Sequence, residues 1–295
     1  MERPKLILLV GPPGCGKSTY ATKYIEEHCN TIRLSSDEIR AEIYGDASIQ
    51  NEPWRVFAIM QSRAIAALKD GQNVVYDATN MTRNDRSGII SLCPKFTKIE
   101  CHIVWAPIET CIERDATRGR TVGKDVIDRM LKRFQAPYYD EGIDTIIVNW
   151  ESVDVCREYG NDLWWRMNIP HDNPHHTLNI QDHCLAARAY AMEHYPEDYI
   201  LRCAAQYHDI GKPYVKAFID AKGNPCEHAH YYQHQCVSAW MCYGISHPDP
   251  SGTVDIAWLI STHMDPFFNT KYYQKLPTYL KDKLDKLHKC DLEAH

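Results

Sequence analysis

The spacing of apolar residues along the chain changes near residue 160. In the first part, short apolar runs alternate with segments of helical length, and this pattern predicts strands at residues 5–10, 31–35, 73–77, 99–106 and 145–149. Strands that alternate with helices indicate a parallel sheet covered by helices. After a weakly patterned join at 152–175, the spacing becomes helical and strand signals nearly vanish. We therefore expect an α/β domain at 1–155 and an all-α domain at 156–295.

The composition is that of a globular protein. Apolar residues make up 44% and charged residues 24% of the 295 positions, which argues against disorder and collagen-like repeats. The 12 cysteines are dispersed, with no CxxC pair, so we expect reduced thiols. The apolar run before Gly11 has only five residues, and no run approaches the length of a membrane span. These features predict a cytoplasmic protein with no membrane partner, and they give no indication of its oligomeric state.

Charge and histidine content distinguish the two parts further. The net charge is −6, so neither part is a basic platform for a long nucleic acid. Of the 15 histidines, only His28 and His102 occur in the first 160 residues. The two parts are therefore expected to carry different chemistry.

A complete phosphate-binding loop follows the first predicted strand. The sequence GPPGCGKST fits the pattern GxxxxGK[ST] and leads into a helical segment, which is the context that this motif requires. Main-chain N–H groups and the helix N-terminus would bind the β-phosphate, Lys17 would neutralise phosphate charge, and Ser18 would bind Mg²⁺. The predicted nucleotide-binding residues of the loop are Gly11, Gly14, Gly16, Lys17, Ser18 and Thr19.

Carboxylates follow the next two predicted strands. Asp37 stands where a strand meets a helix, and Arg40 lies three residues later on the same helical face. Asp37 is a candidate proton acceptor and Arg40 a candidate ligand for an anionic group on the acceptor, although Asp37, Ser35 or Ser36 could also cap the helix. Asp77 follows the third strand, in the position of an acidic residue that supports Mg²⁺ in P-loop enzymes.

Three arginines after the fourth predicted strand form a candidate lid. Arg114 and Arg118 are four residues apart and share a helix face, and Arg120 follows a glycine. Arginines in this place could offset charge on a phosphoryl group during transfer, whereas a solvated charged face is the simpler interpretation of an isolated run. We predict Arg114 and Arg120 as nucleotide-binding residues and Arg118 as a catalytic residue, together with Lys17 and Asp37.

The first part resembles the phage-type polynucleotide 5′-hydroxyl kinases. The resemblance covers residues 5–150 through GPPGCGKST, SSDEIR, VVYDATN and CIERDATRGRTVGKDVIDRM, in this order. It implies an α/β P-loop kinase fold, ATP with Mg²⁺ as the phosphate donor, Asp37 as the general base, and Arg40 as a contact of the acceptor's 3′-phosphate. It also implies a lid function for Arg114 and Arg118 and a role for Asp77 at either the metal or the acceptor.

The histidines of the second part fall into an ordered set of motifs. An HD pair, His208 and Asp209, is followed by Gly211 and Lys212, and further motifs follow in YYQHQCVSA, ISTHM and HKCDLEA. Imidazole and carboxylate ligands suit Mn²⁺, Ni²⁺, Zn²⁺ or Fe²⁺. Neighbouring residues of a helix do not normally face the same way, so His208 and Asp209 can share an ion only if the helix is locally distorted or the ion lies astride its axis.

This set resembles the HD phosphohydrolase superfamily over about residues 174–292, and in particular the HD domains attached to bacterial tRNA nucleotidyltransferases. The resemblance implies His183, His208, Asp209 and Asp291 as metal ligands. His234 and His263 match the ligands of a second ion in relatives with expanded sites, and His230 is a weaker candidate. Lys212 would bind a substrate phosphate.

Together the two resemblances imply a bifunctional enzyme that acts on RNA or DNA strand ends. The first domain would phosphorylate a 5′-hydroxyl, and the second would open a 2′,3′-cyclic phosphate or remove a 2′- or 3′-phosphate. An alternative is a kinase of a nucleoside or sugar joined to a nucleotidase, which the acidic net charge favours. A third possibility, a nucleotide-gated protein with a degenerate HD sensor, fits poorly because Lys17, Asp37 and every expected metal ligand are present.

Overall fold

A computed structural model describes residues 3–174, 177–245 and 250–294 of the protein. The chain divides into two compact units, of which the first contains Met1–Met130 and Pro137–Glu151. The second contains Leu131–Ala136 and Ser152–His295. The boundary between the units thus falls between residues 151 and 152, whereas the sequence predicted it between residues 155 and 156. In addition, the short internal segment Leu131–Ala136 belongs to the second unit.

Long-range packing explains the transfer of residues 131–136. The Phe134 ring lies edge-on against Trp240, with 5.5 Å between ring centroids, and against Tyr243 at 6.1 Å. The main-chain N–H of Ala136 donates to the Ser261 hydroxyl at 3.1 Å. These partners lie more than 100 residues along the chain, so no local pattern could have identified them.

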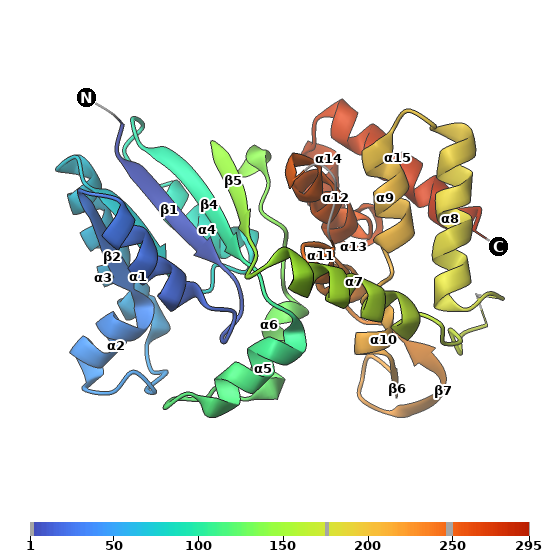
Figure 1. The fold of residues 1–295 in the computed structure, drawn as a ribbon, viewed down its shortest axis with the longest axis horizontal. Coiled ribbons are helices and arrows are strands. Elements are labelled where there is room, and N and C mark those ends of the chain that lie inside the picture. Colours follow the sequence, from blue (N-terminus) through green and yellow to red (C-terminus); the bar gives the residue numbers. More distant parts are fainter. Residues whose placement is uncertain (1–2, 175–176, 246–249, 295) are drawn as a thin grey trace. The chain divides into compact units, whose positions relative to one another are not determined.

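The first unit is built on a five-stranded parallel sheet with the order β2-β3-β1-β4-β5. The prediction of a parallel α/β domain is therefore confirmed, and four of the five predicted strands have the observed bounds. The strands are β1 (Lys5–Val10), β2 (Thr31–Ser35), β3 (Asn73–Asp77), β4 (Lys98–Val104) and β5 (Thr145–Asn149). The helices between them, seen in Figure 1, are α1 (Lys17–Glu27), α2 (Ser36–Tyr44), α3 (Pro53–Lys69), α4 (Arg83–Ile90), α5 (Ile108–Thr117) and α6 (Lys124–Leu131), with a short 3₁₀ turn η1 (Tyr139–Glu141).

The carboxyl end of this sheet collects the functional residues of the first unit. Strand β1 is central, and residues Leu6 to Val10 are fully buried, as expected for a parallel strand covered on both faces. Ser35 at the end of β2 lies opposite Asp77 at the end of β3 in the parallel register. The carboxyl ends of parallel strands lie at the same edge of a sheet. The phosphate-binding loop after β1, Asp37 after β2 and Asp77 at the end of β3 therefore all lie at that edge.

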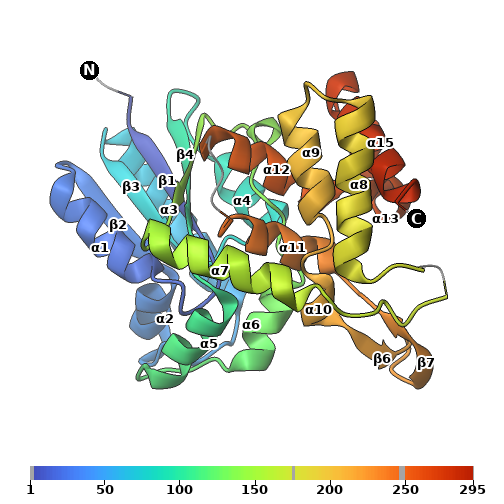
Figure 2. The same cartoon turned by 45° about the vertical axis from the view of Figure 1, so that its right-hand side comes forward.

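The second unit is mainly helical. Helices α8 (Ile180–His194), α9 (Tyr199–Tyr207) and α15 (Thr278–Leu292) pack against one another, and Figure 2 shows them side by side. Within the described residues, no helix is both long and apolar enough to cross a membrane. The helices are α7 (Val153–Arg166), α8 (Ile180–His194), α9 (Tyr199–Tyr207), α10 (Lys212–Val215), α11 (His234–Cys242), α12 (Pro250–Thr262), α13 (Asp265–Phe268), α14 (Thr270–Lys275) and α15 (Thr278–Leu292).

The expectation of an all-α second domain is wrong in one respect. An antiparallel hairpin, β6 (Ala217–Ile219) and β7 (Pro225–His230), extends from the helices (Figure 2). Its turn is held by Asp220, whose carboxylate accepts hydrogen bonds from the main-chain N–H groups of Lys222 and Asn224 at 2.8 Å each. The strands are short, and β7 begins with proline and contains charged and polar residues, so the sequence showed no apolar alternation there.

Candidate functional site

The backbone of the phosphate-binding loop adopts φ angles that glycine allows. Gly11, Gly14 and Gly16 all have positive φ angles, and Gly16 directly precedes α1. A Cβ atom on Gly14 would lie 2.1 Å from the carbonyl oxygen of Cys111. The ammonium of Lys17 donates to the carbonyls of Gly11 and Pro12 at 2.8 Å each, and so lies within the loop that it is predicted to serve.

Replacing Gly14 with alanine is expected to weaken ATP binding at least about tenfold, because both the clash with Cys111 and the left-handed φ of 81° would displace the loop N–H groups. Calorimetric titration with ATP and Mg²⁺ would measure the change. Gly45→Ala is the matched control, since Gly45 has a similar φ of 76° and no atom within 4 Å of its added Cβ. Equal affinities of the two variants would contradict the prediction.

Asp77 is the centre of a polar network beside this loop. Its Oδ2 atom accepts hydrogen bonds from the Ser18 hydroxyl at 3.2 Å and from Arg33 Nε and Nη2 at 3.0 and 2.7 Å. Arg33 also donates to Glu38 at 2.8 Å. Ser18 and Asp77 could hold Mg²⁺ beside the loop, as predicted. Arg33 was not predicted, because an arginine inside a short strand carries no motif.

The loop after β3 is anchored by a buried ion pair. Asn80, with a left-handed φ of 46°, donates from its side chain to the Leu9 carbonyl at 2.8 Å. Arg86 is fully buried, donates to the Asn80 carbonyl at 3.0 Å, and forms a two-point contact with Glu141 at 2.7 and 2.8 Å. The end of β3 is therefore tied to β1 and to η1, which holds Asp77 in position.

Two arginines meet on the carboxylate of Asp37. This residue lies in the first turn of α2, and of the three candidate caps it is Ser35, not Asp37 or Ser36, that caps the helix. Arg40 Nη1 lies 2.7 Å and Arg120 Nη1 lies 2.8 Å from the same oxygen, Oδ1. Arg40 is 7% exposed at its side chain, whereas Asp37 is 57% exposed. The exposed carboxylate is accessible to a hydroxyl group, and the guanidinium groups beside it are suited to bind an anionic group on the acceptor.

The remaining lid arginines make different contacts from Arg120. Arg114 pairs with Glu151 at 2.7 Å, and Arg118 pairs with Asp115 at 2.5 Å. The buried carboxylate of Asp115 also accepts from the N–H groups of Val122 and Gly123 at 2.9 and 2.8 Å. Although burial opposes ionisation, these donors lower the pKa of Asp115. Asp115 therefore shapes the loop that carries Arg120, a function that the sequence did not reveal.

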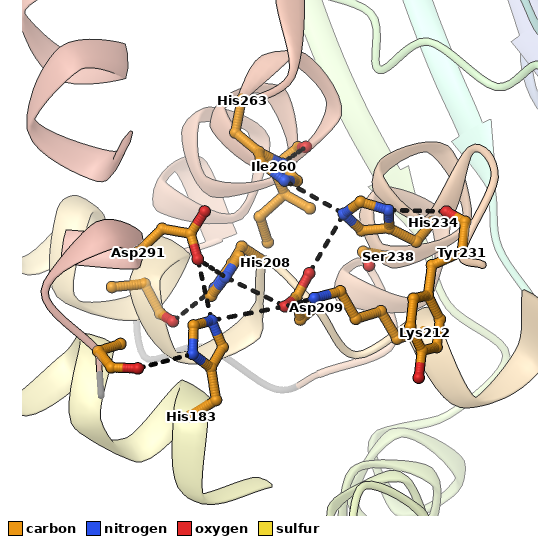
Figure 3. A network of polar contacts seen from close by, with 12 residues as sticks. His183, His208, Asp209, Lys212, Tyr231, His234, Ser238, Ile260, His263 and Asp291 are labelled. Carbon is orange, nitrogen blue, oxygen red and sulfur yellow. Dashed lines mark hydrogen bonds and ion pairs between the residues drawn. The ribbon is translucent and has the colours of Figure 1, made fainter. Parts of the chain in front are cut away.

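In the second unit, four histidines converge on one aspartate (Figure 3): His183 and His234 lie in α8 and α11, and His208 and His263 directly follow α9 and α12. The Asp209 Oδ2 atom lies 3.4 Å from His208 Nε2 and 3.7 Å from His183 Nε2, and its Oδ1 atom lies 3.2 Å from His234 Nε2. His234 Nε2 lies 3.3 Å from His263 Nε2. Two sets of three residues could each hold a metal ion, because the ligand atoms within each set lie within 4.8 Å of one another. One set is His183, His208 and Asp209, and the other is Asp209, His234 and His263.

Asp291 and the end of α9 complete this arrangement. Asp291 Oδ1 lies 2.9 Å from His183 Nε2 and 3.3 Å from His208 Nε2. Helix α9 ends at Tyr207, so His208 caps it and Asp209 lies in the turn that follows. The chain leaves the helix between the two residues, and this lets neighbouring side chains face the same point.

The histidine rings are oriented by the main chain. The Nδ1 atoms of His183, His208, His234 and His263 lie 2.7 to 3.0 Å from the carbonyl oxygens of Ala294, Ala205, Tyr231 and Ile260. A carbonyl can only accept, so each Nδ1 carries a proton and each Nε2 atom faces inward. Inward Nε2 atoms with Nδ1 held by a carbonyl are the usual arrangement of metal-binding histidines, and these residues fit a divalent cation.

The charges of the cluster lead to the same conclusion. Burial opposes ionisation of Asp209, but His208, Lys212 and His234 hold its pKa well below the usual range. Burial also opposes ionisation of Asp291, and its hydrogen bonds with His183 and His208 lower its pKa. Burial, with His234 and His208 nearby, lowers the pKa of His263 to about 3, so its ring is neutral. A buried carboxylate, a partly buried carboxylate and a neutral imidazole form a donor set for a cation.

Lys212 and His171 lie behind the carboxylate of Asp209. Lys212 Nζ is 2.6 Å from Asp209 Oδ2 and 3.4 Å from His171 Nε2. Position 211, between Asp209 and Lys212 in the sequence, requires glycine, because a Cβ atom there would lie 2.6 Å from the main-chain nitrogen of Ser238. His171 stands outside the motif order and was not predicted as a site residue. Its burial and its contact with Lys212 identify it as part of the site.

The weaker candidate His230 is not brought into the cluster. It lies on β7 and its ring stacks on Tyr232, with 5.2 Å between centroids and an angle of 5° between the planes. It belongs to neither set of potential ligands found among the described residues. Although His230 is only four residues from His234 in the sequence, it lies away from the cluster, because the chain turns at Gln233, which has a φ of 62°.

The match to a known protein family falls mainly in the first unit. Residues 6–137 match the AAA domain family. The chain is 28% identical to Transcription factor bHLH140 of Arabidopsis thaliana over 51% of this chain and 16% of that protein. It is 27% identical to Adenylate kinase isoenzyme 1 of Cyprinus carpio over 54% of this chain and 87% of that protein. It is 26% identical to L-seryl-tRNA(Sec) kinase of Methanococcus maripaludis over 45% of this chain and 53% of that protein. The chain thus spans only a small part of the first of these relatives and about half of the third.

Solved structures with similar chains include the Pnkp1/Rnl/Hen1 RNA repair complex, at 28% identity over 45% of this chain and 44% of that chain, with a TM-score of 0.42. A fungal RNA kinase is 15% identical over 58% of this chain and 88% of that chain, with a TM-score of 0.39. The loop geometry, the parallel sheet and the family match agree on the first unit. Residues 6–137 therefore match the AAA domain family and carry a P-loop, and part of the chain is similar in sequence to proteins named as kinases.

Proposed function

We propose that this protein is a bifunctional enzyme that heals nucleic-acid ends. The first unit transfers the γ-phosphate of ATP to a polynucleotide 5′-hydroxyl, and the second hydrolyses a 2′,3′-cyclic phosphate or a 2′- or 3′-phosphate. The observation that carries the proposal is the convergence of His183, His208, His234 and His263 on Asp209, in a chain that also has a complete phosphate-binding loop. Both ends of one strand break would then be substrates of one protein.

The residues of the first unit support a kinase with an anionic acceptor. Lys17 and the loop N–H groups bind the donor phosphates, and Ser18 with Asp77 holds Mg²⁺. Asp37 accepts the proton of the attacking hydroxyl, for which its exposed carboxylate is accessible. Arg40 offers a guanidinium to a phosphate of the acceptor, and Arg120, brought beside it by the loop after α5, reaches the group in transfer.

The residues of the second unit support hydrolysis of a phosphate ester. Asp209 holds the two histidine sets together through its two oxygens, and Asp291 adds a carboxylate to the first set. A divalent cation bound there lowers the pKa of a water ligand and polarises a phosphoryl oxygen. Lys212, fixed by Asp209 and His171, supplies a positive charge for the substrate phosphate.

Two labelled oligonucleotides would test the proposal directly. A 5′-hydroxyl oligonucleotide should accept radioactive phosphate from ATP, and an oligonucleotide that ends in a 2′,3′-cyclic phosphate should be opened when Mn²⁺ or Ni²⁺ is present. Failure of phosphate transfer at every salt concentration would overturn the kinase half. Failure of ring opening and of monoester release with all four candidate metals would overturn the other half.

The second candidate is a small-metabolite kinase joined to a nucleotidase. Relatives named adenylate kinase and UMP-CMP kinase, and the net charge of −6, favour it. Salt separates the two candidates, because binding of a strand releases counterions whereas a metabolite makes few phosphate contacts. We expect oligonucleotide turnover to fall steeply between low and high salt. A flat dependence, together with faster turnover of nucleosides, would favour the second candidate.

A further inference from the structure

A cleft of about 490 Å³ lies along one face of α7 in the second unit. Its volume is within the usual range of small-molecule sites. Arg157, Gly160, Asn161, Trp164 and Trp165 line it at helical spacing, and Gln206 at the end of α9 faces them. None of these residues belongs to the phosphate-binding loop or to the metal cluster.

Gly160 is the first sign that the cleft has a use. It lies in the interior of a helix, where glycine is among the least favourable residues. Its φ is not in the left-handed region, and among the described residues nothing lies within 4 Å of the Cβ that another residue would add. Neither backbone conformation nor close packing explains the missing side chain, which instead leaves the floor of the cleft open.

The side chains around Gly160 have the chemistry of a nucleobase site. Trp165 is 72% exposed, which is unusual for so large an apolar side chain, and Trp164 is half-buried beside it. Within the described parts of the chain, the side-chain amides of Asn161 and Gln206 have no hydrogen-bond partner. Indole faces stack on bases, and amides pair with the donor and acceptor edge of a purine. Arg157, largely exposed, can reach an attached phosphate.

We propose that this cleft binds the base of a purine nucleotide, with the base stacked on Trp165 over Gly160 and its edge held by Asn161 and Gln206. The site is separate from both proposed active sites and does not depend on their activities. Gln206 lies two residues before His208, so an occupant would contact the same end of α9 that presents the metal ligands. The base can come from a free nucleotide or from a nucleotide within a strand.

The test uses the full chain labelled with 5-fluorotryptophan, in a Lys17→Ala background that weakens nucleotide binding at the phosphate-binding loop. Replacing Trp164 or Trp165 with phenylalanine assigns their fluorine resonances. We expect AMP to move the Trp165 resonance, and ribose 5-phosphate, which has the phosphate but no base, to leave it unchanged. A short single-stranded RNA that saturates the shift at lower concentration than AMP would identify the strand as the source of the base.

Gly160→Leu should weaken this binding at least about tenfold, because the new side chain occupies the floor of the cleft. Glu158→Leu is the matched control, since it places the same residue on the exposed face of the same helix outside the cleft. An unmoved Trp165 resonance, an equal response to ribose 5-phosphate, or full binding by Gly160→Leu would overturn the proposal. So would a Trp165 resonance that moves only with protein concentration, which would assign the cleft to a second copy of this chain.

Discussion

Replacing Asp209 with asparagine is expected to reduce hydrolysis of 2′,3′-cyclic phosphate ends by at least about 100-fold. Asp209 contributes both of its oxygens, one toward His208 and the other toward His234, and no other described residue is common to both ligand sets. An amide keeps the shape but loses the negative charge and one acceptor. Metal bound per protein should fall together with activity, whereas phosphorylation of a 5′-hydroxyl oligonucleotide should be unchanged.

Asp282→Asn is the matched control for this loss. Asp282 lies on α15, which also carries Asp291, but its partner is Lys286 and it is 56% exposed. Because Asp209→Asn also removes the partner of buried Lys212, thermal unfolding should be compared in both variants, and His263→Gln provides a second way to empty one ligand set. Unchanged hydrolysis and metal content in both site variants would show that the cluster is structural only.

Replacing Asp37 with asparagine is expected to slow phosphate transfer by about 100- to 10 000-fold, the usual contribution of a general base. The amide can still accept hydrogen bonds from Arg40 and Arg120, so the local structure should persist. The proposed ATP site is the loop after β1, so the affinity for ATP should remain close to that of the unchanged protein. Single-turnover transfer to a 5′-hydroxyl oligonucleotide, with ATP affinity measured by calorimetry, separates these two effects.

Glu38→Gln is the matched control for Asp37→Asn. Glu38 is the next residue of α2 and is similarly exposed, at 63% against 57%, but its partner is Arg33. Its replacement should change transfer by less than about tenfold, since it removes one exposed ion pair. If Asp37→Asn transfers phosphate at the full rate, or if both variants lose activity equally, Asp37 is not the base.

Local patterns identified most of the first unit. All five predicted strands are present, four of them with the observed bounds, and a strand buried on both faces such as β1 is a continuous apolar run that needs no distant information to identify. The phosphate-binding loop was recognisable for a similar reason: Gly11, Gly14 and Gly16 each meet a backbone requirement within a few residues. Arg33 and Asp115 were missed because their partners, Asp77 and the loop at 122–123, are defined by the folded chain.

The second unit depended more on its tertiary structure. The motif order indicated His183, His208, Asp209, His234 and His263, but it also suggested His230, which the turn at Gln233 directs to Tyr232. His171 showed no motif and is nevertheless in contact with Lys212. The hairpin β6 and β7 was missed because its residues lack an apolar alternation.

By itself, the sequence determined the strands of the first unit, the phosphate-binding loop and the types of residue available for catalysis, since these follow from local spacing and backbone preference. Only the tertiary structure decided which charged side chains form ion pairs and which potential metal ligands lie together. Arg120, and not Arg114 or Arg118, pairs with Asp37, and the two oxygens of Asp209 divide between two histidine sets. Ion pairs and ligand sets depend on distances of a few ångströms between residues that are far apart in sequence, and those distances exist only after the helices have packed.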